Sequence, residues 1–237
     1  MRDAAGRLMA SPLLALAALP LLGLGLASTL RRRFARRPPS SSARPATRAT
    51  KEANARVLSE LPFSDDPAFA LAHRGFIAPL PRETLRGKHG VPVWDPKKFD
   101  FIEEGSKAPP TVNPSLWRQS QLLNIAGLFE VTEGIYQVRN QDLSNMTLVE
   151  GERGVTVFDP LISEETSKAA LELYFRHRPR RPVVAVVYTH SHIDHYGGVR
   201  GVVDEADVEA GKVAIFAPAG FVEEALSENV MADNVMT

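Results

Sequence analysis

An apolar run at residues 182–189, PVVAVVYT, restricts the fold more than any other segment, because it contains no charged side chain. A strand with one solvated face would alternate apolar and polar residues, so an unbroken run is typical of a strand that is covered on both faces. Such strands occur in sheets that carry helices on their faces. We therefore predict that residues 182–189 form a strand of an α/β domain that is covered on both faces.

The segments around this run alternate between strand-like and helix-like patterns. Short runs of β-forming residues are separated by turn-forming residues. Ser163 is a favourable N-cap residue, with two glutamates after it and arginines near the expected helix end. This alternation predicts an α/β fold. The expected elements are strands at 134–138, 146–150, 155–158 and 213–217, and helices near 51–61, after Ser163, near 198–203 and near 221–227. An amphipathic run extends over residues 116–125.

Four residues with metal-binding side chains follow the apolar run directly, within His190-Ser191-His192-Ile193-Asp194-His195. Because side chains at i and i+2 of an extended chain point the same way, His190 and His192 can bind one metal ion together. Where the chain turns towards the next helix, Asp194 and His195 project elsewhere, which suits a second metal ion nearby. The sequence therefore predicts two half-built metal sites at the end of the strand.

The absence of cysteine limits the chemistry of these sites. Disulfides and thiolate ligands are excluded, so a transition metal must be held by histidine and carboxylate ligands. The other interpretation is that the cluster consists of ordinary polar loop residues. It is disfavoured because four candidate ligands fall within six residues, directly after a strand without charged residues. His73, His89 and His177 lack such a context and are predicted to be structural. Asp159 ends the strand at 155–158 and is either a turn residue or an acceptor that orients a metal-binding histidine.

The N-terminus contains an uncharged run at Leu8–Leu30 that is long enough to span a bilayer as a helix. Arg2 and Arg7 precede it and small residues lie near its end, as in a signal peptide. The arginine cluster at residues 31–37 favours instead a membrane anchor with this end in the cytoplasm. We expect residues 1–37 to be a signal peptide or membrane anchor, so that the protein is exported to the periplasm or held at a membrane. An organellar transit peptide and a buried helix are the alternatives.

Charge is balanced over the whole chain, with 28 basic and 28 acidic residues, which argues against nucleic acid as a partner. The balance is uneven, because residues 1–50 hold nine arginines and one acid. Proline, serine and arginine dominate residues 38–50, which predicts a flexible linker. We expect residues 51–130 to form an N-terminal extension and residues 131–237 to form part of a catalytic domain.

The sequence from Thr189 to His195, with Gly197 and Gly198, resembles the HxHxDH motif of the metallo-β-lactamase superfamily. A narrower similarity to the zinc-dependent alkyl sulfatases runs from about residue 51 to residue 237. It is carried by PFSDDPAFALAHRGFIAPL, which ends at Leu80, by TVNPSLWRQ at 111–119, GLFEVTEGIYQVR at 127–139, DLSNMTLVEG at 142–151 and VRGVV at 199–203.

The resemblance implies the metallo-β-lactamase αββα sandwich, of which residues 131–237 would form the N-terminal half. It implies two Zn²⁺ ions, one bound by His190 and His192 and the other by Asp194 and His195, and hydrolysis of an alkyl sulfate ester to alcohol and sulfate. The remaining ligands, the sulfate-binding groups and a dimerisation domain would lie beyond residue 237, and the complete enzyme would be a homodimer. Because this motif does not determine the substrate, two alternatives stay open: a lactam, thioester or phosphodiester hydrolase, and an inactive metal-binding fragment.

Overall fold

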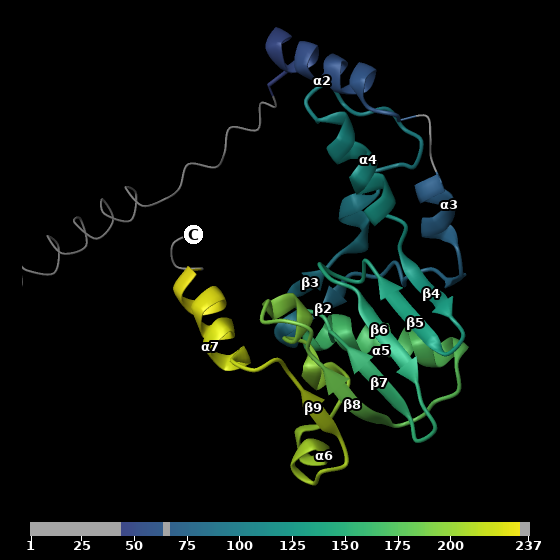
Figure 1. The fold of residues 1–237 in the computed structure, drawn as a ribbon, viewed down its shortest axis with the longest axis vertical. Coiled ribbons are helices and arrows are strands. Elements are labelled where there is room, and N and C mark those ends of the chain that lie inside the picture. Colours follow the sequence, from purple (N-terminus) through teal and green to yellow (C-terminus); the bar gives the residue numbers. More distant parts are fainter. Residues whose placement is uncertain (1–43, 64–66, 233–237) are drawn as a thin grey trace, which may run out of the picture. The chain divides into compact units, whose positions relative to one another are not determined.

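The structure is a computed structural model that describes residues 44–63 and 67–232 (Figure 1). The predicted signal or anchor segment, residues 1–37, lies outside the described residues. The chain divides into two units, residues 1–45 and 46–237, and the second unit contains all of the elements below. Among the described residues, no helix combines the length and the apolar character needed to cross a bilayer.

A seven-stranded sheet with the order β1-β4-β5-β6-β7-β8-β9 forms the centre of the fold. Neighbouring strands from β1 to β7 are antiparallel, whereas β7, β8 and β9 run parallel. A mixed sheet with helices confirms the predicted α/β class. The strands are β1 (Phe76–Ala78), β4 (Gly127–Thr132), β5 (Ile135–Arg139), β6 (Met146–Glu150), β7 (Val155–Phe158), β8 (Val183–Val187) and β9 (Ala214–Phe216).

Helix α5 (Glu164–His177) supplies the main helical part of the core and lies behind the strands in the view of Figure 1. Ser163 caps it as predicted: the Ser163 hydroxyl accepts from the amide of Thr166, and the Thr166 hydroxyl accepts from the amide of Ser163. Alternate side chains of β5, β6 and β7 are buried in one cluster with Tyr174 and the other inward residues of α5. This alternation is what a sheet with one face on a core requires.

The predicted boundary at residue 130 falls inside β4, a strand that the sequence patterns did not indicate. β4 pairs with β5 and also with β1, so part of the predicted extension belongs to the central sheet. Gly127 permits this close pairing, because its φ is +145° and a Cβ built on it would lie 2.4 Å from the carbonyl oxygen of Ala78. The signal was weak because the first three residues of β4 are all buried, which hides the two-residue period.

The rest of the predicted extension consists of helices and a small second sheet. Helix α2 begins at Arg48, where the Thr47 hydroxyl accepts from the amide of Thr50, so this helix includes the last residues of the predicted linker at 38–50. The helix predicted near residues 51–61 is α2, and most of the amphipathic run at 116–125 belongs to α4. The elements are α2 (Arg48–Glu60), α3 (Pro67–His73), α4 (Pro114–Leu123), β2 (Leu85–Arg86) and β3 (Pro92–Trp94), and the last two pair with each other.

Two expectations about the C-terminal part of the described chain were wrong in detail. Within the described residues, β8 is not covered on both faces, because only Val186 of this strand is fully buried. The helix expected near 198–203 is a single 3-10 turn, η4 (Val199–Gly201).

The other two elements expected in this part of the chain are present. The strand expected at 213–217 is β9, and the last predicted helix is α7 (Phe221–Leu226), which continues into a π-helical turn, η5 (Ser227–Ala232). A short helix, α6 (Glu205–Glu209), precedes β9.

Candidate metal centre

The candidate metal centre lies at the carboxyl ends of β7 and β8. Because these two strands are parallel, the residues that follow them emerge at the same edge of the sheet. The amide of Asp159, directly after β7, donates to the carbonyl oxygen of Val187 at the end of β8, with an N···O distance of 3.0 Å. Tertiary pairing therefore brings Asp159 beside the histidine motif, which begins at His190, three residues after the end of β8 at Val187.

The structure brings the four predicted ligands close to one another, and the rings of His190 and His195, which belong to different predicted pairs, lie with their centroids 4.0 Å apart. Nε2 of His190 lies 3.1 Å from Nδ1 of His192. Oδ2 of Asp194 lies 3.4 Å from Nε2 of His195. Ligand atoms at two corners of a tetrahedron around zinc, with bonds of about 2.0–2.1 Å, are about 3.3 Å apart. Each pair thus has a spacing that suits one shared ion, and the donor set of imidazole and carboxylate suits zinc. The assignment of these residues as ligands stays a prediction.

Asp159 contacts one histidine of the motif directly. Its Oδ2 lies 2.9 Å from Nδ1 of His195. Because an ionised carboxylate only accepts hydrogen bonds, this contact places the hydrogen of the imidazole on Nδ1 and leaves a lone pair on Nε2. Nε2 is the atom of His195 that faces Asp194. This is the arrangement that an orienting role for Asp159 requires.

Asp159 reaches a second histidine through Thr189. The Thr189 hydroxyl donates to Oδ2 of Asp159 at 2.7 Å, and its oxygen lies 2.9 Å from Nδ1 of His190. With its own hydrogen committed to Asp159, the hydroxyl accepts from Nδ1–H of His190, so the lone pair of His190 is on Nε2. One carboxylate therefore orients one histidine of each predicted pair.

Asp159 is also close enough to be considered as a ligand. Its carboxylate and nitrogen atoms of His190 and His195 all lie within 4.8 Å of one another. However, Oδ1 of Asp159 accepts from the amide of Thr189 at 2.8 Å, and Oδ2 already accepts two hydrogen bonds. A carboxylate that is occupied in this way fits the orienting role better than direct coordination.

The backbone around Asp159 has an unusual conformation that places its side chain. Asp159 and Leu161 both have positive φ angles, 53° and 64°, which only glycine adopts without cost. Leu161 is fully buried, and its carbonyl oxygen accepts from the amide of Gly198 at 2.8 Å. A Cβ built on Gly198 would lie 2.2 Å from the carbonyl oxygen of Pro160. The loop after β7 and the glycine turn after the motif therefore fit together only because residue 198 has no side chain.

The sequence analysis missed Asp142 and Ser144, which lie under the motif. Both are buried, and the Ser144 hydroxyl donates to the carbonyl oxygen of Asp194. Burial raises the pKa of Asp142, and hydrogen bonds from Thr166 and from the amides of Ile162 and Ser144 partly oppose that rise. The segment DLSN that contains them is part of the family resemblance, and Asp142 is also a turn-forming residue between two predicted strands, but nothing in the local pattern indicates a contact with residue 194.

Glu228 and Asn229 in η5 also contact the motif and were not foreseen. Oε2 of Glu228 accepts from the Ser191 hydroxyl at 2.9 Å and lies 3.5 Å from Nε2 of His192. Nδ2 of Asn229 donates to the carbonyl oxygen of Ser191 at 3.2 Å. These contacts join residues almost forty positions apart, which no local sequence signal could predict.

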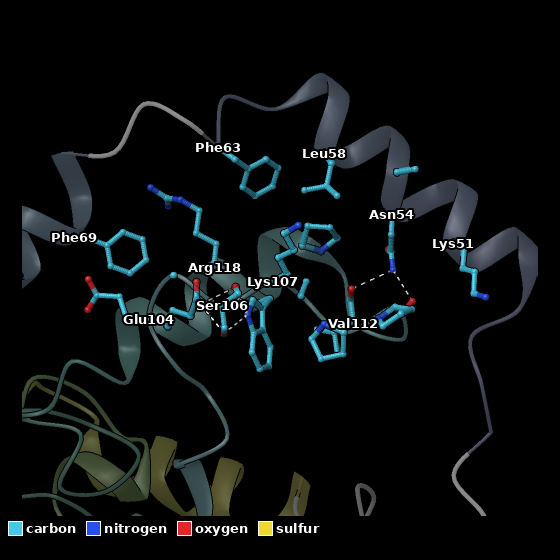
Figure 2. Close-up of a pocket in the computed structure, with 18 residues that line it drawn as sticks. Lys51, Asn54, Leu58, Phe63, Phe69, Glu104, Ser106, Lys107, Val112 and Arg118 are labelled. Atoms are coloured by element: carbon cyan, nitrogen blue, oxygen red, sulfur yellow. Dashed lines mark hydrogen bonds between the residues drawn. The ribbon is translucent and has the colours of Figure 1, made fainter.

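One cavity among the described residues is remote in sequence from the metal motif. Figure 2 shows this cavity of about 790 Å³, which is lined by residues of α2, α4 and the segment 104–112. Its walls include the apolar side chains of Leu58, Phe63, Phe69 and Trp117, and none of the motif residues lines it. The cavity is therefore distinct from the candidate metal centre.

Comparison with known proteins identifies relatives for most of the chain. Residues 139–233 match the family model described as the metallo-beta-lactamase superfamily. A linear primary-alkylsulfatase of Pseudomonas sp. is 68% identical over 198 residues, which are 84% of this chain and 29% of that protein. An (R)-specific secondary-alkylsulfatase of Pseudomonas sp. is 53% identical over 197 residues, or 83% of this chain and 29% of that protein.

A solved structure gives the same result for the fold. The structure of the stereoselective inverting sec-alkylsulfatase Pisa1 from Pseudomonas sp. matches with a TM-score of 0.74 and 54% sequence identity. The match covers 81% of this chain and 30% of that chain. The chain therefore spans less than a third of the length of these relatives, and within that part the predicted fold is confirmed.

Proposed function

This chain belongs to the metallo-β-lactamase superfamily and is a relative of the alkylsulfatases, and on that basis we propose that it serves in the hydrolysis of alkyl sulfate esters. In this proposal it provides the first ligands of a site for two zinc ions, at which an ester yields an alcohol and inorganic sulfate. The observation that carries the proposal is the spacing of the two ligand pairs, 3.1 Å for His190 and His192 and 3.4 Å for Asp194 and His195.

The residues of the candidate metal centre have different roles in this proposed chemistry. A bound zinc pair supplies Lewis acidity, which makes water a better nucleophile and stabilises negative charge on a departing sulfate. His190, His192, Asp194 and His195 would hold the two ions. Asp159 keeps Nδ1 of His195 protonated, and through Thr189 it does the same for His190, so that each imidazole presents Nε2.

The proposal requires further ligands, because a catalytic zinc ion usually has three protein ligands and each motif pair offers two. We propose that these ligands, and the groups that bind the sulfate, are supplied by parts of the protein outside the described residues. A homodimer and an association with the membrane through residues 8–30 are also proposed, on the family resemblance and on the apolar N-terminus respectively.

The relatives favour sulfate esters over the other substrates of this fold. Two curated relatives with more than half of the aligned residues identical are alkylsulfatases, whereas no observation on this chain favours a lactam, a thioester or a phosphodiester. The proposal is tested by assaying release of sulfate from a medium-chain alkyl sulfate by the protein at its natural length. Activity should be lost to a chelator and restored by zinc. A zinc-loaded protein that releases no sulfate from any alkyl chain length would contradict the proposed substrate class.

A further inference from the structure

We propose that Asp142 and Ser144 are positioning residues that hold Asp194, and with it the metal ion of the Asp194–His195 pair, in place through the backbone. We call these two residues the 142–144 bracket. The inference rests on the proposed metal site, but it does not depend on the identity of the substrate. It concerns residues outside the four predicted ligands.

The first observation is the contact between Ser144 and the motif. The Ser144 hydroxyl donates to the backbone carbonyl oxygen of Asp194, fifty residues later in the chain. Ser144 is only 7% exposed, so water cannot easily replace this donor. The hydrogen bond therefore fixes the main chain at the residue whose carboxylate faces Nε2 of His195.

The second observation is that Asp142 fixes Ser144 in turn. Its Oδ1 accepts from the amide of Ser144 at 3.1 Å. Its Oδ2 accepts from the amide of Ile162 at 3.0 Å and from the Thr166 hydroxyl at 2.6 Å. Asp142 is 2% exposed. The bracket is thus tied to the loop after β7 and to the first turn of α5, the same segment that begins with Asp159.

These contacts hold both residues of the Asp194–His195 pair in position. His195 is held by Asp159 through its ring, whereas the Asp194 carboxylate has His195 as its only polar partner among the described residues. The position of that carboxylate is therefore determined by the Asp194 backbone, which Ser144 holds. The His190–His192 pair contacts Thr189 and Glu228 instead, and within the part of the chain that the structure describes the hydrogen bonds of the bracket go to other residues.

This asymmetry predicts a selective effect on one metal ion. Removing the Ser144 hydroxyl should weaken the Asp194–His195 site about tenfold or more, as is usual for residues that support a metal ligand, and should leave the other site nearly unchanged. Ser167→Ala provides a matched control, because Ser167 is a fully buried serine whose hydroxyl has no hydrogen-bond partner among the described residues.

The experiment is a zinc-retention measurement on the protein at its natural length. Unaltered protein, Ser144→Ala and Ser167→Ala are exposed to increasing chelator, and retained zinc is determined by elemental analysis. At a chelator concentration that leaves two ions on the unaltered protein and on Ser167→Ala, Ser144→Ala should retain one. Retention of both ions by Ser144→Ala, or loss of both in one step, would overturn the proposal.

A second variant keeps the test decisive if Ser144→Ala does not fold. Asp142→Asn keeps the side-chain volume, but its NH₂ group must face at least one of the groups that now donate a hydrogen bond to Asp142. The variant should therefore lose the same single zinc ion as Ser144→Ala. Full retention of zinc by folded Asp142→Asn would contradict the bracket. If the unaltered protein binds two zinc ions but hydrolyses no sulfate ester, the proposed function fails while the retention measurement still tests the bracket.

Discussion

Nδ1 of His195 lies 2.9 Å from Oδ2 of Asp159, although the two residues are 36 positions apart in the chain. Asp159 follows β7 and His195 belongs to the motif after β8, so their contact depends on the parallel pairing of these strands. The same carboxylate accepts from the amide and the hydroxyl of Thr189. Asp159 thereby connects the sheet to the orientation of the histidines on which the proposed chemistry depends.

Asp159→Asn should therefore weaken zinc binding without removing a predicted ligand. An asparagine must present its NH₂ group to at least one of the donors that Asp159 now accepts from, which disturbs His195 or Thr189. We expect zinc affinity to fall about 10–100-fold, the usual range for such supporting residues. Competition with a chromophoric chelator measures it. Asp100→Asn, which changes an exposed aspartate that pairs with Arg82, is the control and should bind zinc normally.

The division of the four predicted ligands into two pairs makes a prediction about stoichiometry. His190→Ala should remove one zinc ion, Asp194→Ala should remove the other, and the double variant should bind none tightly, because each site then lacks one of the ligands that a catalytic zinc ion needs. Elemental analysis of the purified natural-length protein measures the zinc content. Unchanged zinc content in the double variant would show that these residues are not ligands, whereas loss of both ions in each single variant would show that the sites are not separate.

The ion pair between Glu150 and Arg178 makes a prediction about how the stability of the fold depends on pH. Oε1 and Oε2 of Glu150 accept from Nε and Nη2 of Arg178, each at 2.9 Å, and Oε1 also accepts from the Tyr174 hydroxyl at 2.6 Å. The hydrogen bonds from Arg178, followed by the one from Tyr174, hold the pKa of Glu150 below its usual value of 4.5. Since the folded pKa is the lower one, this stabilisation is complete above the usual pKa and is lost as the pH falls through the folded pKa.

Glu150→Gln should therefore lower the free energy of unfolding at neutral pH by about 1 kcal/mol, which is less than is usual for hydrogen bonds to charged groups because the Arg178 side chain is 36% exposed. Its stability should also change less than that of the unaltered protein as the pH falls below 4.5. Thermal or urea unfolding at several pH values measures both effects. Glu172→Gln, on the more exposed pair with Arg180, should cause a smaller change. An equal change in the two variants would count against the assigned role of Glu150.

The N-terminal run makes a prediction about location. Residues 1–49 fused to a reporter should direct it to or across a membrane, since the uncharged run at Leu8–Leu30 is long enough to span a bilayer. Cell fractionation and protease accessibility distinguish export from an anchor with the arginine cluster in the cytoplasm. A reporter that stays in the soluble cytoplasmic fraction would refute the prediction. Replacing Leu14 and Leu21 with arginine provides the control that should abolish targeting.

Some features of this protein could be predicted from the sequence because their causes are local. The cap at Ser163 depends on residues within one helical turn. The pairing of His190 with His192 depends on the two-residue period of extended chain. The absence of cysteine restricted the ligand types without any knowledge of the fold. For each of these, a few neighbouring residues contain all of the information.

Other features were decided only by the tertiary structure. Asp159 could be proposed from its place after a strand, but its choice of His195 depends on the register of β7 with β8. The contact of Ser144 with Asp194 depends on a loop and a motif that the folded sheet brings together across fifty residues. Hydrogen bonds of this kind leave no periodic or compositional trace in the chain, because each partner is an ordinary polar residue until the fold places it beside the other.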